Sequence, residues 1–123
     1  MDSTDSQNRR TLPRVREDLN VHITILSSPE DESLTGQEFD CHTKDISFQG
    51  MCIISDSRVY PGSKLDLQVQ ANTSSHTYSF SGMVMWCNHD QAFQVYDVGV
   101  QLMDLDKISI GWKKLVVDLL ITS

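Results

Sequence analysis

The stretch Leu19-Asn-Val-His-Ile-Thr-Ile25 places an apolar residue at every second position, with polar residues between them. Successive side chains of a β-strand point to opposite faces, so this alternation predicts a strand with one buried and one exposed face. The stretch Leu65-Asp-Leu-Gln-Val-Gln-Ala71 repeats the pattern. The sequence therefore predicts a protein built mainly from half-buried β-strands.

Four further segments also have the composition of strands. They are residues 37–46, the apolar run 51–54, residues 78–86 with Gly82 where a bend or bulge is expected, and residues 93–103. Turn-forming or polar residues separate the strands, at 27–36, at Pro61-Gly62, at 72–75 and at 88–92. Six short strands at this spacing predict an all-β-dominated fold, a closed or nearly closed six-stranded antiparallel barrel.

The end of the chain changes its period. Apolar residues at helical spacing, with charged residues on the opposite face, predict an amphipathic C-terminal α-helix that packs over an end or a face of the barrel. The apolar residues are Ile108, Trp112, Leu115, Val116 and Leu119. Asp104 or Asp106 is the expected N-cap of this helix.

The chain has 123 residues, which is enough for one domain with a hydrophobic core. Its net charge of −7 argues against binding a nucleic acid polymer, because that affinity comes from neutralising many phosphates. The first 16 residues nevertheless carry four arginines and only two aspartates. We therefore expect a flexible N-terminal arm, residues 1–18, that forms part of a small anion site, and a barrel domain, residues 19–123.

Apolar runs and cysteines indicate the compartment. No run approaches the roughly 20 apolar residues that cross a bilayer, and residues 1–8 lack the apolar segment of a secretory signal. We expect a cytoplasmic protein without membrane insertion. Cys41, Cys52 and Cys87 are an odd number at wide spacing, which predicts reduced thiols in or near the core, and neither disulfides nor a metal site.

Two short motifs lie before the first predicted strand and at the end of the second. They are Arg10-Thr-Leu-Pro-Arg14 and Asp45-Ile-Ser47-Phe-Gln-Gly50. In order and separation they resemble the RxxxR and [DN]xSxxG signatures of the PilZ family. Residues 82–86, 98–102 and 104–106 add to the resemblance, which extends from Arg9 to about Leu120.

The resemblance implies a PilZ-like split barrel that binds cyclic diguanylate (c-di-GMP), a bacterial second messenger. The implied ligand-binding residues are Arg9, Arg10, Arg14, Asp45, Ser47, Gly50 and Trp86. Their chemistry suits the ligand, because a guanidinium pairs with phosphate or with guanine O6 and N7 and stacks on a purine. A carboxylate accepts from guanine N–H groups, a hydroxyl offers a further bond, and a glycine permits close approach.

Several of these residues have alternative interpretations. Asp45, Ser47 and Gly50 on their own would be an ordinary strand-to-turn connection, with Asp and Ser bonding nearby amides. An arginine directly before RxxxR, here Arg9, resembles the sequence of family members that bind two ligand molecules. This resemblance implies two nucleotides per chain and no other cofactor. Alternatively, Arg9 only adds long-range attraction for the ligand. Trp86 lies beside a guanine or in the core. Pro13 disfavours a helix at Leu12, so we expect an extended or turning arm that wraps the ligand.

The implied function is that of a signal receptor whose ligand changes the surface offered to an unidentified downstream protein. The alternative is a nucleotide-independent adaptor that acts through constitutive protein contacts. Catalysis is not expected: Ser47 could act as a nucleophile and His22, His42, His76 or His89 as a base, but no motif of a hydrolase surrounds them.

Overall fold

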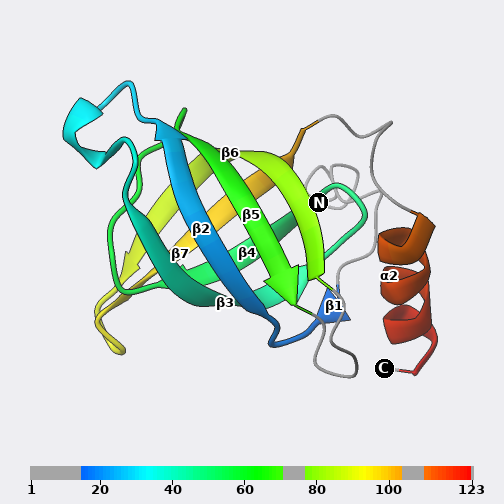
Figure 1. The fold of residues 1–123 in the computed structure, drawn as a ribbon. Helices are drawn as coiled ribbons and strands as arrows, with labels where there is room; N and C mark the ends of the chain where they lie inside the picture. The colour runs from blue at the N-terminus through cyan, green and yellow to red at the C-terminus, as the bar shows by residue number, and fades with distance from the viewer. Residues whose placement is uncertain (1–14, 71–76, 104–109, 123) are drawn as a thin grey trace, which may run out of the picture.

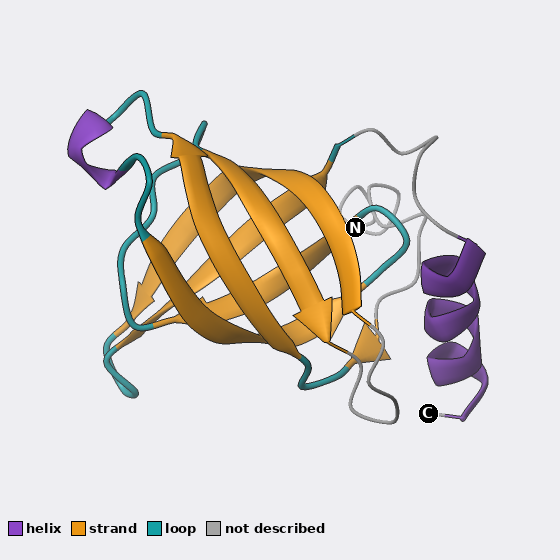
Figure 2. Cartoon of the chain, in the orientation of Figure 1, coloured by secondary structure: helices purple, strands orange, loops and turns teal. Residues whose placement is uncertain are grey.

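A computed structural model describes residues 15–70, 77–103 and 110–122. Figure 2 shows strands around a central interior and one longer helix beside them. The strands are β1 (Val15–Arg16), β2 (Asn20–Ser27), β3 (Glu38–Ile46), β4 (Gly50–Ser55), β5 (Lys64–Gln70), β6 (Thr77–Asp90) and β7 (Val95–Leu102). The helices are the short 3-10 helix η1 (Glu32–Leu34) and the α-helix α2 (Ile110–Thr122).

Six of the strands form a closed antiparallel barrel. The hydrogen-bonded order runs β3-β2-β5-β6-β7-β4, and a pairing between β3 and β4 closes the ring. In Figure 1, β2 and β5 form the wall nearest the viewer, whereas β4 and β7 lie behind them. The barrel and its C-terminal helix confirm the predicted fold class.

The alternating stretches form the inside of the barrel. Val21, Ile23 and Ile25 of β2 are at most 1% exposed. They lie opposite Val69, Leu67 and Leu65 of β5, which are equally buried. Burial of these branched side chains is the main favourable contribution to folding, about 1.5–3 kcal/mol for each. The period-two pattern thus identified the inward face of both strands correctly.

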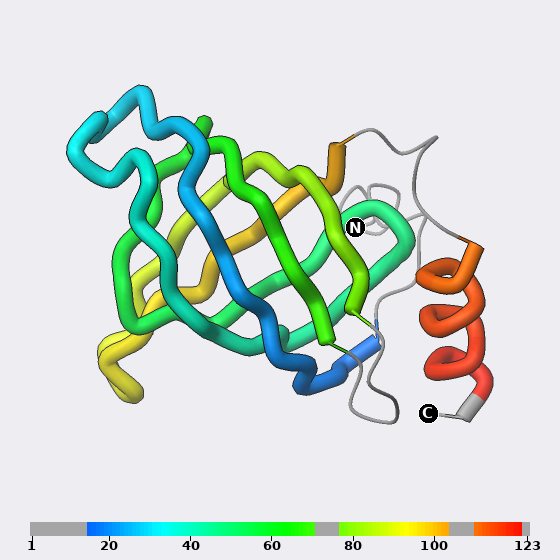
Figure 3. The backbone as a smooth tube through the Cα atoms, viewed as in Figure 1, coloured from blue at the N-terminus to red at the C-terminus, as the bar shows by residue number. Residues whose placement is uncertain are grey.

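Helix α2 lies at the end of the barrel where β5 ends and β6 begins, close to β1 (Figure 3). Trp112 and Val116 are fully buried there. The Trp112 ring packs edge-to-face on Phe80 and Tyr78, with centroid distances of 4.8 and 5.5 Å. Packing over a barrel end is confirmed, whereas the two N-cap candidates lie outside the described residues.

Two predictions about β6 are wrong. The strand continues to Asp90, through residues predicted as a loop, because polar side chains are tolerated on its outward face. The turn that follows is tighter than expected: the Asp90 carboxylate accepts from the Ala92 and Phe93 amides, and Gln94 adopts a φ of 57°. The register shift lies between Val84 and Trp86, so the bulge is at Met85 rather than at Gly82.

Gly82 has a packing role instead of a bulge. A Cβ atom at this position would lie 2.6 Å from Val100 Cγ1 and 2.9 Å from Leu67 Cδ1 inside the barrel. Such distances are well below van der Waals contact, so any larger residue would displace core side chains. The glycine therefore allows β6 to approach the packed interior closely.

Strand β1 was not predicted. Val15 pairs with Ile46 and Arg16 with Asp45, so β1 extends the sheet at the end of β3. The buried Thr43 hydroxyl accepts from the Leu19 amide and donates to the Glu17 carbonyl, which holds the connection between β1 and β2. Residues 15–18 of the predicted arm are therefore attached to the barrel; its predicted flexibility stays a prediction.

Candidate ligand-binding site

A cavity of about 760 Å³ lies on the outer surface of the barrel, over β3, β4, β6 and β7. We call it the β4–β7 cavity. Four of the seven predicted site residues line it, namely Asp45, Ser47, Gly50 and Trp86. These residues come from separate strands and the turn between β3 and β4. Arg9, Arg10 and Arg14 lie outside the described residues.

Ser47 and Gly50 together close the turn between β3 and β4. The Ser47 amide donates to the Gly50 carbonyl over 2.8 Å. The Ser47 hydroxyl accepts from the Gly50 amide over 3.1 Å and donates to its carbonyl over 3.2 Å. Ser47 is 3% exposed, so its hydroxyl primarily fixes the turn that shapes this edge of the cavity.

Gly50 also permits the close approach of β4 to β7. A Cβ atom there would lie 2.8 Å from the Val100 carbonyl oxygen, which belongs to the backbone. Relief of this clash would require the two strands to separate, because a backbone atom cannot rotate away. The glycine of the second motif therefore determines the shape of the cavity floor.

Trp86 is half-exposed, at 42%, and its indole lies directly over Gly99 of β7. The two residues are register partners, and a Cβ on Gly99 would overlap the indole ring. The bulge at Met85 precedes Trp86 and reorients the strand at this point. The structure thus places Trp86 on the cavity wall, with an aromatic face available to a flat ligand.

Asp45 lies where the N-terminal segment joins the barrel. Its register partners are Arg16 of β1 on one side and Cys52 of β4 on the other. The chain that leaves Val15 toward the RxxxR motif therefore begins beside the cavity. Sequence reasoning omitted Arg16, which the structure places as an exposed residue of β1.

Lys44 and Asp97 are further charged residues of the cavity wall. Lys44 Nζ lies 3.1 Å from Asp97 Oδ2, and this ion pair reaches from β3 to β7 across β4. The hydrogen bond that the Lys44 ammonium donates to the Asp97 carboxylate raises the pKa of Lys44. The sequence did not predict Lys44, Asp97 and Gly99 as cavity residues, because the register of three strands brings them together. Gly99 was noted only as part of the motif at residues 98–102.

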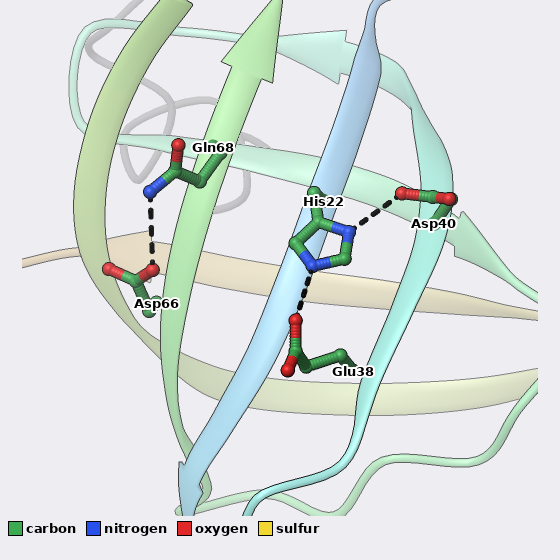
Figure 4. Close-up of polar contacts among 5 residues, drawn as sticks. All are labelled: His22, Glu38, Asp40, Asp66 and Gln68. Atoms are coloured by element: carbon green, nitrogen blue, oxygen red, sulfur yellow. Dashed lines mark hydrogen bonds and ion pairs between the residues drawn. The ribbon is translucent and has the colours of Figure 1, made fainter.

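The β2–β3–β5 side of the barrel carries a different polar cluster (Figure 4). His22 Nδ1 lies 2.8 Å from Asp40 Oδ1, and His22 Nε2 lies 2.8 Å from Glu38 Oε1. The hydrogen bonds to Asp40 and Glu38 raise the pKa of His22 above its usual value of about 6.5. Both ring nitrogens of the imidazolium therefore have carboxylate partners.

The cysteines match their predicted state: Cys52 is buried, and Cys41 and Cys87 are half-buried free thiols. Burial, with smaller contributions from Asp40 and Asp56, raises the pKa of Cys41 to about 12. This thiol therefore stays protonated at neutral pH. Within the described ranges, no helix has both the length and the apolar character required to cross a membrane.

Together, the barrel, the C-terminal helix and the external cavity define a small β-barrel domain with room for a ligand. A family model described as PilZ domain matches residues 8–121. The chain therefore belongs to the PilZ domain family, as the two motifs predicted. A search of curated proteins finds no match to this chain.

Solved structures of PilZ proteins have the same fold. The Bacillus subtilis inhibitor of motility (MotI/DgrA) has a TM-score of 0.67 at 19% identity, over 93% of this chain and 50% of that chain. The PilZ domain with c-di-GMP of YcgR from Escherichia coli has a TM-score of 0.61 at 10% identity, over 93% and 90% of the two chains. The Borreliella burgdorferi PlzA protein in complex with c-di-GMP has a TM-score of 0.60 at 20% identity, over 96% and 43%.

At these levels of sequence identity, the comparisons show that this chain shares the fold of those proteins. This chain spans about half the length of the Bacillus subtilis protein, where the coverage is 50%.

Proposed function

We propose that this protein is a receptor that binds c-di-GMP in the β4–β7 cavity, with the RxxxR arm covering the ligand. One observation carries the proposal: Asp45, Ser47, Gly50 and Trp86 line a single cavity, although Asp45 and Trp86 are 41 positions apart in the sequence. Membership of the PilZ family and the c-di-GMP complexes of two structural neighbours support this ligand.

The position of β1 supports a role for the arm. Arg14 is bonded to Val15, and Val15 pairs with Ile46, the residue before Ser47. Consecutive Cα atoms are about 3.8 Å apart, so the four residues from Arg14 back to Arg10 span at most roughly 15 Å. We propose that Arg10 and Arg14, which are this close to β1 in the sequence, supply the cationic, planar groups that phosphates and guanines require.

Isothermal titration calorimetry with c-di-GMP tests the receptor assignment. We expect the wild-type protein to bind, and Arg10→Ala or Arg14→Ala to remove most of the binding, because a hydrogen bond to a charged group contributes about 1.5–3 kcal/mol. Arg58→Ala is the matched control, since Arg58 packs over Tyr60 and does not line the cavity. Wild-type affinity in both arm variants would refute the role of the arginines.

Ligand stoichiometry is a separate part of the proposal. We propose two nucleotides per chain, because an additional guanidinium at Arg9 would offset repulsion between the phosphates of two stacked ligands. Arg9→Leu should then lower the stoichiometry toward one while the fold is retained. Saturation of the wild-type protein at one nucleotide per chain, with both concentrations verified independently, would remove this part and leave the receptor assignment intact.

The signal is proposed to reach a downstream protein through a changed surface. Strand β1 lies beside α2, and α2 exposes Ile110 and Ile121, at 83% and 76%. Arm closure over a ligand would therefore act on the segment that contacts this helix. The alternative, a nucleotide-independent adaptor, is favoured if the titration gives no heat with c-di-GMP while a partner still binds.

The proposed receptor has no catalytic role. The Ser47 hydroxyl is engaged with Gly50, and His22 is held by Asp40 and Glu38, so these partners do not favour a nucleophile and base pair. A cytoplasmic location remains a prediction from the sequence.

A further inference from the structure

The ion pair between Lys44 and Asp97 forms a polar wall of the β4–β7 cavity. The register of β3 against β4 shifts between Thr43 and Asp45, so Lys44 occupies a bulge. A bulge redirects its side chain relative to the regular alternation of the strand. The two side chains are 43% and 22% exposed, so both remain accessible from the cavity they line.

This pair presents an ordered set of hydrogen-bonding groups. The Lys44 ammonium is a donor, and the adjacent Asp97 carboxylate supplies two acceptor oxygens. The Watson–Crick edge of guanine has the complementary order, with the acceptor O6 followed by the N1–H and N2–H donors. Adenine has a donor amino group where guanine has O6, and an acceptor N1 where guanine has a donor. The pair therefore matches guanine and mismatches adenine.

We propose that Lys44 and Asp97 read the Watson–Crick edge of one guanine of the ligand, and so determine the specificity of the cavity for guanine over adenine dinucleotides. This inference rests on the proposed function. It gives a base-reading role to two residues that lie outside the RxxxR and [DN]xSxxG motifs. Trp86 lines the same cavity, so an aromatic face for stacking lies within the space where the base edge would be read.

Lys44 also brings a positive charge to the described lining of the cavity. The described charged residues that line the cavity are Lys44, Asp45 and Asp97. Lys44 therefore supplies a positive charge beside the two negative phosphates of the proposed ligand. The Asp97 hydrogen bond raises the pKa of Lys44, so the ammonium stays charged at neutral pH. Because an ion pair this exposed contributes little to stability, its members can take up new partners at small cost.

Binding of two ligands to two variants tests the inference. We expect wild-type protein to prefer c-di-GMP over cyclic diadenylate. Asp97→Asn replaces one acceptor by a donor that opposes the guanine N–H groups, and Lys44→Met removes the donor to O6. Each change should weaken c-di-GMP binding about tenfold to a hundredfold, the range for a bidentate base contact, and reduce the preference for guanine.

Two matched controls lie on β5, away from the cavity. Asp66→Asn and Lys64→Met make the same chemical changes on exposed or half-exposed residues and should leave both affinities unchanged. Thermal melts verify that all four variants fold. If wild-type protein binds c-di-GMP but Asp97→Asn and Lys44→Met keep its affinity and its preference, this inference is wrong and the proposed function stands. If wild-type protein binds neither nucleotide, both fail.

Discussion

Two hollows on the outer surface of the barrel are lined by side chains of different chemical character. The β4–β7 cavity measures about 760 Å³, and the second hollow, over β2, β3 and β5, about 490 Å³. We call the second one the β2–β5 hollow. The first has Trp86 on its wall and glycines beneath it. The described lining of the second has no Trp, Tyr or Phe.

The polar groups of the two hollows also differ in their hydrogen-bond partners. In the β2–β5 hollow, His22 is held by two carboxylates at 2.8 Å, which leaves neither ring nitrogen for a ligand. In the β4–β7 cavity, the Lys44–Asp97 pair offers donors and acceptors beside an aromatic ring. A lining that combines a flat apolar face with accessible polar groups favours ligand binding, so the β4–β7 cavity is the better candidate site of the two.

The largest expected effect concerns the floor of the β4–β7 cavity. Gly50→Ala places a Cβ 2.8 Å from the Val100 carbonyl oxygen, so β4 and β7 must separate. We expect the free energy of unfolding to fall by about 1–3 kcal/mol and c-di-GMP binding to be lost. Denaturant unfolding measures the first effect and calorimetry the second.

Gly111→Ala is a suitable comparison for this variant, because Gly111 is exposed in α2. Alanine there should change stability by less than roughly 1 kcal/mol, because Gly111 is the second residue of the helix, where glycine costs less than in a helix interior. Equal stability of Gly50→Ala and wild type would contradict the described contact between β4 and β7.

A smaller effect is expected from the aromatic wall. Trp86→Ala should weaken c-di-GMP binding by a factor of about 5 to 150, equivalent to roughly 1–3 kcal/mol for stacking of one base, with little loss of stability. Phe93→Ala removes an aromatic ring that is even more exposed, at 77%, but lies in the β6–β7 turn outside the cavity. If the two variants bind alike, stacking on Trp86 is excluded.

The smallest effect is expected in the β2–β5 hollow. The folded-state pKa of His22 is raised, chiefly by Asp40 and then by Glu38, so its ion pairs contribute fully below about pH 6.5 and are lost as the pH rises through the raised value. His22→Gln should therefore lower stability at pH 6, by less than about 1 kcal/mol because the pair is exposed, and not at pH 9.

Binding of c-di-GMP by His22→Gln should equal that of wild type, since His22 does not line the β4–β7 cavity. Denaturant unfolding at pH 6 and pH 9 measures the effect on stability, and a calorimetric titration with c-di-GMP measures the effect on binding. A larger destabilisation at pH 9 than at pH 6 would reverse the sign assigned to His22.

Local patterns sufficed for the barrel but only partly for the site. The alternation at Leu19–Ile25 and at Leu65–Leu67 identified buried faces, because strand burial repeats every two residues. Asp45 and Trp86, which the motifs predicted as site residues, both line the β4–β7 cavity. Lys44 and Asp97 were missed, because a bulge and the register across β4 bring them together. Strand β1 was missed because two residues carry no detectable period.

We propose that c-di-GMP occupies the β4–β7 cavity and not the β2–β5 hollow. Backbone amide chemical shifts during a titration with c-di-GMP test it most directly. We expect the largest changes at Asp45, Gly50 and Gly99, and none at Asn20, Gln68 and Gln70. Large changes confined to Asn20, Gln68 and Gln70, or no changes at saturating c-di-GMP, would contradict it.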